Sequence, residues 1–233
     1  MHKFKDDYLD KEFLNIIVNK KNTLKEIHKN IYYGKIFNDK FLDLIINLIE
    51  NYESSLDNNS EIHANSMHEN AIPFSNLSLN QCINDFIKNY FTKIANLLYP
   101  DRFKKKFDGI HSYVVRYGDN YDRNLGFHVD DSLITINLCL KNDSKGSELC
   151  FSGIRCPLHI DTPSMKNEKK IITHEKGFAV IHDGKNRHHI NDIYSGERYN
   201  LIIWCQDKEE KVNWFNSLQN NKCLDFCEYK EFF

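Results

Sequence analysis

A histidine and an aspartate two residues apart, followed much later by a group of histidines, are the residues whose types and spacing could do chemistry. His128 and Asp130 form the pair, and His182, His188 and His189 form the later group. Residues two apart on one strand point to the same face, so His128 and Asp130 can reach a single ion. With a distant histidine they would supply two imidazoles and one carboxylate, the ligand set of a non-haem Fe(II) site. The sequence therefore predicts such a site, with three candidates for the third ligand.

An arginine shortly after the histidine group adds to this interpretation. The guanidinium of Arg198 presents a planar fork that matches a carboxylate, so it could hold the far end of a dicarboxylate whose near end is bound to the metal. A lone His-x-Asp pair is weak evidence, because a hydrogen-bonded surface pair gives the same pattern. The pair gains weight because a predicted strand, residues 132–140, follows it directly.

The elements that must position these residues are short strands. From residue 108 onward, alternation and β-branched runs predict strands that are separated by turn signals such as Asp183-Gly184 and Ser195-Gly196. This pattern is typical of an all-β barrel or jelly roll. The predicted strands are 111–117, 132–140, 148–151, 178–182 and 199–205. The charged run Lys166–Lys170 is predicted to be a solvated loop.

Helical spacing dominates the first hundred residues. Apolar residues between 6 and 31 predict two short helices, and the stripe from Phe41 to Tyr52, preceded by Asn38 as N-cap, predicts a longer one. A further helix is predicted over 79–98, where Pro100 ends it. The polar stretch 53–69 is predicted to be a loop or linker. We therefore expect an N-terminal helical extension over residues 1–60 and a second domain over 61–233, with its β core at about 108–206 and a C-terminal tail.

Composition limits the classes of partner. The chain has 233 residues with 31 basic and 33 acidic side chains, a formal net charge of -2, so it lacks the bulk positive charge that favours nucleic acid or anionic membranes. Its beginning lacks an apolar run of signal-peptide length, and no stretch approaches the roughly 20 apolar residues of a membrane span. We therefore expect a soluble protein of the cytoplasm or nucleus that acts on a protein or a small molecule. The oligomeric state is not predicted.

Seven cysteines are scattered over the chain. An odd number in a chain of this size fits reduced, buried thiols better than a disulfide framework. Cys223 and Cys227, together with Cys156 or Cys205, could hold zinc. Because no Cys-x-x-Cys pair is present, ordinary packing is the preferred interpretation.

Four stretches resemble the iron(II)- and 2-oxoglutarate-dependent dioxygenases, and specifically their prolyl-4-hydroxylase-like branch. The resemblance is strongest to the 2-oxoglutarate and iron-dependent oxygenase domain-containing proteins and spans about residues 65–205. The stretches are Leu125-Gly-Phe-His-Val-Asp-Asp-Ser, Thr135-Ile-Asn-Leu-Cys-Leu, Glu148-Leu-Cys-Phe-Ser-Gly-Ile-Arg-Cys and Gly196-Glu-Arg-Tyr-Asn-Leu-Ile-Ile-Trp-Cys. In this branch a basic residue follows the distal histidine by ten positions, and His188 and Arg198 have that separation.

The resemblance implies roles for particular residues. His128, Asp130 and His188 would be the iron ligands, and Arg198 would hold the distal carboxylate of 2-oxoglutarate. Pocket-wall positions are implied at Tyr117, Asn137, Leu149 and Trp204. Gly146-Ser147 departs from the paired glycines usual at that turn. His189 stands where a small residue is usual, which leaves a ligand shifted by one position as an alternative. His182 and His111 are interpreted as structural.

The resemblance also implies a fold and an activity. The fold would be mainly β with flanking helices, a double-stranded β-helix (jelly-roll) core packed on N-terminal helices. The activity would be hydroxylation of an unactivated C–H bond, of a prolyl or lysyl side chain of a protein, with Fe(II), 2-oxoglutarate, O2 and ascorbate, releasing succinate and carbon dioxide. One alternative is a non-catalytic, metal-binding β-barrel module. Another is an oxygenase acting on nucleic acid, for which Lys104–Lys106 is the one candidate basic stretch.

Overall fold

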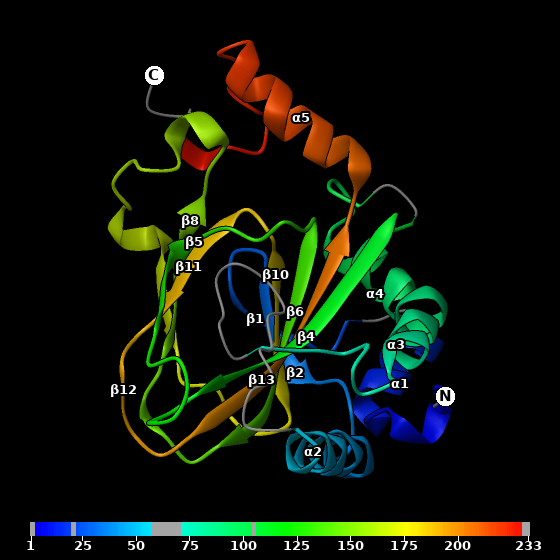
Figure 1. Ribbon diagram of the computed structural model, residues 1–233. Coiled ribbons are helices and arrows are strands. Elements are labelled where there is room, and N and C mark those ends of the chain that lie inside the picture. Colours follow the sequence, from blue (N-terminus) through cyan, green and yellow to red (C-terminus); the bar gives the residue numbers. More distant parts are fainter. Residues whose placement is uncertain (1–2, 20–21, 57–70, 104–105, 230–233) are drawn as a thin grey trace.

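The computed structural model describes residues 3–19, 22–56, 71–103 and 106–229. Two antiparallel sheets face each other, and helices lie along the outer side of the larger one (Figure 1). The larger sheet has the strand order β1-β2-β10-β6-β13-β4-β3, the smaller has the order β5-β11-β8-β9, and β7 pairs with β12. The expected fold class, mainly β with flanking helices, is confirmed. The strands are β1 (Lys25–His28), β2 (Ile31–Lys35), β3 (Ile72–Pro73), β4 (Gly109–Tyr117), β5 (Leu125–His128), β6 (Ile134–Asn142), β7 (Lys145–Gly146), β8 (Leu149–Ile154), β9 (Lys169–Ile172), β10 (Phe178–Asp183), β11 (Asn186–Ile190), β12 (Ile193–Ser195) and β13 (Arg198–Gln206).

The larger sheet separates two buried clusters, and the central strand β6 shows how. Its residues Ile134, Ile136 and Leu138 pack into the core that the sheet shares with the helices. The residues between them, Thr135 and Asn137, point to the opposite side and line a cavity between the two sheets. Because side chains alternate along a strand, one strand supplies the core with one face and the cavity with the other.

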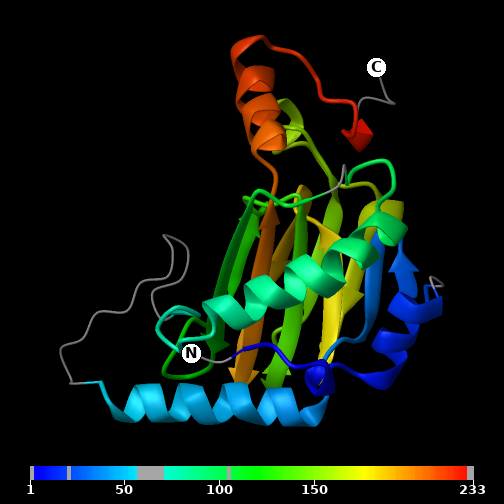
Figure 2. The same cartoon turned by 90° about the vertical axis from the view of Figure 1, so that its right-hand side faces the viewer.

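Helices cover the outer face of the larger sheet, and Figure 2 shows them crossing it. The predicted helix after Asn38 is confirmed: the Asn38 side chain accepts the backbone N–H of Phe41, 3.3 Å away, as an N-cap does. The helix predicted over 79–98 is also present, but it contains a π-helical turn, η2. The helices are α1 (Lys11–Asn19), α2 (Asp39–Ser54), α3 (Asn80–Phe86), η2 (Ile87–Phe91), α4 (Thr92–Leu98) and α5 (Lys208–Gln219), with short 3-10 turns η1 (Asp6–Tyr8), η3 (Pro157–His159) and η4 (Lys166–Glu168).

The second short helix predicted before residue 31 is wrong. Residues 25–35 instead form the hairpin β1–β2, which turns at Asn30 with a positive φ of 57°, and β2 pairs with β10 of the larger sheet. A few apolar residues at short intervals fit a helix and a strand equally well, and the sheet edge offered by β10 decides between them. The N-terminal segment is therefore built into the sheet. The domain boundary expected near residue 60 and most of the predicted 53–69 linker lie outside the described residues.

The charged run Lys166–Lys170 is not a solvated loop. It forms η4 and the start of β9, and Glu168 within it is buried. The Glu168 carboxylate accepts hydrogen bonds from both terminal nitrogens of Arg155, at 2.7 and 2.8 Å. A buried ion pair thus fixes a segment whose composition alone suggests exposure.

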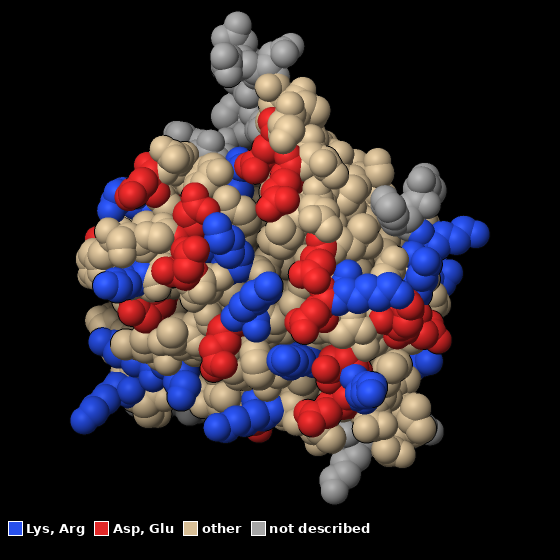
Figure 3. Space-filling view, turned by 90° about the horizontal axis from the view of Figure 1, so that it is seen from below, with Lys and Arg blue, Asp and Glu red and all other residues tan. Residues whose placement is uncertain are grey.

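Charges of both signs are interspersed over the face seen from below in Figure 3. This view agrees with the near balance of acidic and basic residues in the sequence. Lys104 and Lys105 lie outside the described residues. Among the described residues, no helix combines the length and the apolar character needed to cross a membrane.

Candidate metal centre

Two histidines face each other across a strand pair of the smaller sheet. His128 ends β5 and is the register partner of His188 in β11. Each Nδ1 lies beside a carbonyl oxygen two residues back in its own strand, 2.8 Å from Gly126 O and 2.9 Å from Asn186 O. Nδ1 therefore donates its proton to the backbone, which leaves each Nε2 with a lone pair. This is how metal-binding histidines are usually oriented.

The carboxylate of Asp130 faces both of those nitrogens. Its Oδ1 lies 3.6 Å from His128 Nε2 and 3.8 Å from His188 Nε2, and the three ligand atoms lie within 4.8 Å of one another. These separations exceed a hydrogen bond, and a cation between the atoms would bring them together. The sequence expectation that His128 and Asp130 share one strand is wrong in detail, because β5 ends at His128 and Asp130 lies in the loop beyond it.

Hydrogen bonds hold that loop in place. The Asp130 N–H donates to Gly184 O at 2.8 Å, and Lys185 Nζ donates to Asp130 O at 2.7 Å. Thr135 of β6 donates its hydroxyl proton to Asp130 Oδ2. One carboxylate oxygen is therefore held by Thr135 and the other faces the histidines, so the side chain is aimed before any ligand binds.

The electrostatics suit a cation. Burial lowers the pKa of His128 to about 4, assisted by the nearby His188, and burial also lowers the pKa of His188 to about 4. Burial alone would raise the pKa of the Asp130 carboxyl, but the surrounding histidines lower it below its ordinary value. Near neutral pH the group therefore holds two neutral imidazoles and one carboxylate. A buried carboxylate facing neutral rings needs positive charge, which a divalent metal would supply.

The other two candidate histidines lie outside this group of three. His182 of β10 is fully buried, donates Nδ1–H to Asp183 O at 2.9 Å, and keeps Nε2 3.9 Å from Asp130 Oδ2. The ring of His189 lies 6.2 Å from that of the half-exposed Phe127. Of the three histidines, the structure places His188 with His128 and Asp130. The position of His182, buried beside Asp130, agrees with its interpretation from the sequence as a structural residue.

Arg198 begins β13 and is 1% exposed. Its Nε donates to Asn200 Oδ1 at 2.8 Å, and its Nη1 donates to Ser147 O. Its Nη2 is buried without a hydrogen-bond partner among the described residues. A buried guanidinium with an unused N–H fits the carboxylate of a ligand.

The cavity between the sheets is reached by residues from both. The ring of Tyr117 stands 5.4 Å from the Arg198 guanidinium carbon, and Asn137 is linked to Arg198 through Asn200. Of the four predicted pocket-wall residues, Tyr117 and Asn137 line this cavity, whereas Leu149 and Trp204 are buried between the sheets outside its lining. The lining comprises Tyr113, Tyr117, Leu125, His128, Asp130, Thr135, Asn137, His188, Ile190 and Ile202.

Sequence reasoning missed Tyr113 and Thr135 in this lining. Both could have been found by counting in steps of two, because Tyr113 shares a face of β4 with Tyr117, and Thr135 shares a face of β6 with Asn137. His111 packs 5.6 Å from Trp204 and stays a structural residue by its position.

Comparison with known proteins agrees with this geometry. A family model described as the OGFOD2-like domain matches residues 1–103. The 2-oxoglutarate and iron-dependent oxygenase domain-containing protein ICU11 of Arabidopsis thaliana is 31% identical over 190 residues, which are 81% of this chain and 48% of that protein. The 2-oxoglutarate and iron-dependent oxygenase domain-containing protein 2 of Mus musculus is 26% identical over 204 residues, which are 87% of this chain and 54% of that protein. The chain thus spans about half the length of these curated relatives.

A solved structure shares the fold. It is a prolyl hydroxylase in complex with a hypoxia inducible factor oxygen degradation domain peptide fragment, from Trichoplax adhaerens, with a TM-score of 0.53 at 16% identity over 89% of this chain and 98% of that one. This likeness confirms the expected jelly-roll core. In sequence the chain is similar to the 2-oxoglutarate and iron-dependent oxygenase domain-containing proteins, and its first 103 residues match the OGFOD2-like domain. The cofactors of these relatives are iron and 2-oxoglutarate, as their names state.

Proposed function

We propose that this protein hydroxylates an unactivated C–H bond in a reaction that consumes 2-oxoglutarate and O2 and releases succinate and carbon dioxide. The observation that carries the proposal is the arrangement of His128, Asp130 and His188. Both imidazoles are oriented by their own strands so that Nε2 faces Asp130 Oδ1, at 3.6 and 3.8 Å. These residues would hold the iron, and three protein ligands would leave positions for 2-oxoglutarate and O2.

The protein's own share of the reaction is binding, orientation and exclusion of water. Ferrous iron held by these residues would supply, with O2 and 2-oxoglutarate, the oxidising chemistry that breaks the C–H bond. Asp130 supplies a negative charge in a buried site, where it is 3% exposed, and Thr135 fixes the orientation of its carboxylate. Arg198, with its unused Nη2–H, would bind the distal carboxylate of 2-oxoglutarate. Tyr117 and Asn137 would flank the co-substrate between the iron ligands and Arg198.

We further propose that the oxidised group is a prolyl or lysyl side chain of a protein. Two comparisons support this choice. The procollagen-lysine,2-oxoglutarate 5-dioxygenase 1 of Rattus norvegicus is 26% identical over 182 residues, 73% of this chain and 23% of that protein. The prolyl hydroxylase of Trichoplax adhaerens, which shares the fold, is bound to a peptide fragment. Phe127, half-exposed beside His128, would meet the peptide at the mouth of the site.

The test measures succinate formed from 2-oxoglutarate with Fe(II) and ascorbate, first without and then with peptides that contain proline or lysine. We expect turnover by the wild-type chain and its loss in His128→Ala, Asp130→Ala and His188→Ala, because each variant removes an iron ligand. His189→Ala is the matched control and should retain turnover. A mass increase of one oxygen atom on a proline or a lysine peptide would show which side chain is hydroxylated.

Three outcomes would contradict the proposal at different levels. Full turnover in His188→Ala with loss in His189→Ala would show that the distal ligand is shifted by one residue. Binding of Fe(II) without any consumption of 2-oxoglutarate would identify a non-catalytic metal-binding module. Turnover that is stimulated by neither kind of peptide would overturn the substrate class alone.

A further inference from the structure

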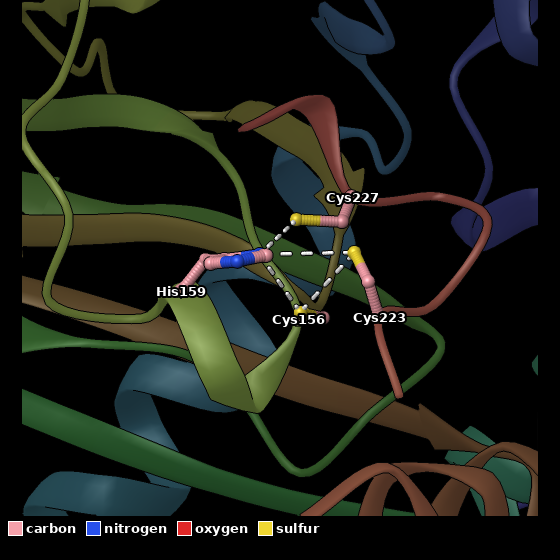
Figure 4. Close-up of side chains that lie close together, drawn as sticks. All are labelled: Cys156, His159, Cys223 and Cys227. Atoms are coloured by element: carbon pink, nitrogen blue, oxygen red, sulfur yellow. Dashed lines mark hydrogen bonds between the residues drawn. The ribbon is translucent and has the colours of Figure 1, made fainter. Parts of the chain in front are cut away.

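A second group of potential metal ligands lies outside the candidate iron site. It joins two segments far apart in the sequence: Cys156 and His159 at the turn η3 that follows β8, and Cys223 and Cys227 in the segment after α5. Figure 4 shows the three sulfur atoms and the imidazole converging on one point. One donor atom from each of the four residues lies within 4.8 Å of the other three.

The separations between these atoms are those of a tetrahedral site. Cys156 Sγ and Cys223 Sγ are 3.8 Å apart, and His159 Nδ1 lies 3.3, 3.4 and 3.7 Å from the sulfurs of Cys156, Cys227 and Cys223. Tetrahedral bonds of about 2.3 Å to sulfur and about 2.0–2.1 Å to nitrogen give edges of roughly 3.8 Å between two sulfurs and roughly 3.6 Å between sulfur and nitrogen. The cluster therefore has the dimensions of a zinc site before any ion is added.

Ordinary packing and a disulfide explain the cluster less well. A disulfide needs sulfurs about 2.05 Å apart, and all the cysteines here are free thiols. Packing alone accounts for Cys82, Cys139 and Cys205, which are buried at separate places in the fold and belong to no group of ligands among the described residues. Cys205, which the sequence offered as an alternative partner, lies in the helix-side core. Spacings of Cys-x2-His and Cys-x3-Cys are those of paired zinc ligands.

We infer that Cys156, His159, Cys223 and Cys227 bind one structural zinc ion. Three thiolates and one imidazole in tetrahedral array select zinc over magnesium or calcium, which prefer oxygen ligands. Four protein ligands leave no open position, as in zinc sites that stabilise a fold. This inference does not depend on the proposed oxygenase activity, because it uses none of the residues of the candidate iron site.

The ion would fasten the C-terminal segment to the end of β8. Other contacts already join these parts: Glu228 Oε2 accepts the backbone N–H of Ile154 at 2.8 Å, and the ring of Tyr229 lies 5.2 Å from that of His159. β8 is the neighbour of β11, with Phe151 opposite His188. Arg187, next to His188, donates to the carbonyls of Ile160 and Thr162 just after η3. The turn η3 and the residues just after it therefore support β11, the strand that carries His188.

The test measures the metal content of the 233-residue chain. Purified protein is dialysed against EDTA at neutral pH, and its zinc is measured by mass spectrometry of the elements. We expect one zinc per wild-type chain, and its loss in Cys227→Ser and His159→Ala. Cys150→Ser, at a buried cysteine of β8 outside the cluster, is the matched control and should keep the zinc. Asp130→Ala should also keep it, which separates this site from the iron site.

Two further measurements cover the case in which the zinc-ligand variants fail to fold. Wild-type protein loaded with Co(II) should show the near-ultraviolet charge-transfer band of thiolate-bound cobalt. Titration of the wild-type chain with a mercurial thiol reagent should release zinc. Purified wild-type protein that contains no zinc but has a disulfide bond between Cys156 and Cys223 would overturn the inference. Full zinc content in the folded Cys227→Ser variant would do so as well.

Discussion

His128 and His188 are register partners on adjacent antiparallel strands, with ring centroids 4.2 Å apart. One backbone pairing, β5 with β11, therefore sets two of the three proposed iron ligands. Side chains alternate along a strand, so a shift of one residue would bring His189 to the position of His188 and turn the proposed ligand to the other face. The third ligand, Asp130, depends on a different contact, the hydrogen bond from its N–H to Gly184 O.

Replacement of Arg198 should weaken binding of 2-oxoglutarate. Arg198→Ala removes the unused buried Nη2–H, and we expect the KM for 2-oxoglutarate to rise about 10- to 100-fold, the effect of losing a charged hydrogen bond of about 1.5–3 kcal/mol. Succinate formation at saturating 2-oxoglutarate should persist. Arg198→Lys keeps the charge but loses the planar fork, so its KM for 2-oxoglutarate should lie between those of the wild type and of Arg198→Ala. An unchanged KM in Arg198→Ala would exclude the proposed contact.

The backbone at residue 184 passes so close to that of Ser132 that only glycine fits there. A Cβ added there would lie 2.1 Å from Ser132 O, so Gly184→Ala should displace the loop that carries Asp130. We expect a loss of about 1–3 kcal/mol of stability and a marked loss of Fe(II) affinity. Gly126→Ala is a suitable control, because an added Cβ at this β5 position meets nothing within 4 Å. Equal Fe(II) affinities in the two variants would show that the Gly184 contact does not position Asp130.

Breaking the ion pair between Arg155 and Glu168 should lower the stability of the folded protein. Arg155 is fully buried, so Glu168→Ala removes the carboxylate that pairs with its charge, and we expect the free energy of unfolding to fall by about 3–5 kcal/mol. Urea denaturation measures this loss. The double variant Arg155→Met with Glu168→Leu should lose less than Glu168→Ala, because no charge remains buried. A loss below about 1 kcal/mol in Glu168→Ala would argue against a desolvated pair.

His174 should make stability fall in acid. Its Nε2 donates to Phe178 O at 2.8 Å and its Nδ1 accepts from Asn200 at 3.0 Å; burial, with Arg198 nearby, lowers its pKa to about 3. Between the unfolded pKa of about 6.5 and this value, the unfolded chain binds a proton that the folded chain excludes. The stability is therefore complete above about pH 6.5 and declines as pH falls, by up to about 1.4 kcal/mol per pH unit. His174→Gln should reduce this slope in urea denaturation between pH 6.5 and 4; an unchanged slope would contradict it.

The sequence predicted the candidate site better than it predicted the smaller elements around it. The His-x-Asp pair and the later histidine group pointed to three residues, His128, Asp130 and His188, whose ligand atoms the structure places within 4.8 Å of one another. Helix α2 and the strands β4, β6 and β13 were predictable because their hydrophobic periods extend over many residues. A long pattern averages over local exceptions.

Other features depend on contacts that no local pattern reveals. The hairpin β1–β2 exists because β10 offers it a pairing edge, and Glu168 is buried because Arg155 reaches it from β8's end. His159 was missed as a possible ligand because its partners Cys223 and Cys227 come more than sixty positions later, beyond an intervening set of strands. Each of these depends on tertiary arrangement, which single-sequence periodicity does not contain.

The pairing of β2 with β10 has a practical consequence for shortened versions of the protein. A fragment limited to residues 108–206 would keep every proposed iron ligand, yet it would lose the strand that covers β10. The uncovered strand would present a row of unsatisfied N–H and C=O groups, which favours self-association between molecules. His182, which touches Asp130, lies on that same strand. A fragment that keeps β10 covered must therefore begin before residue 31, the first residue of β2.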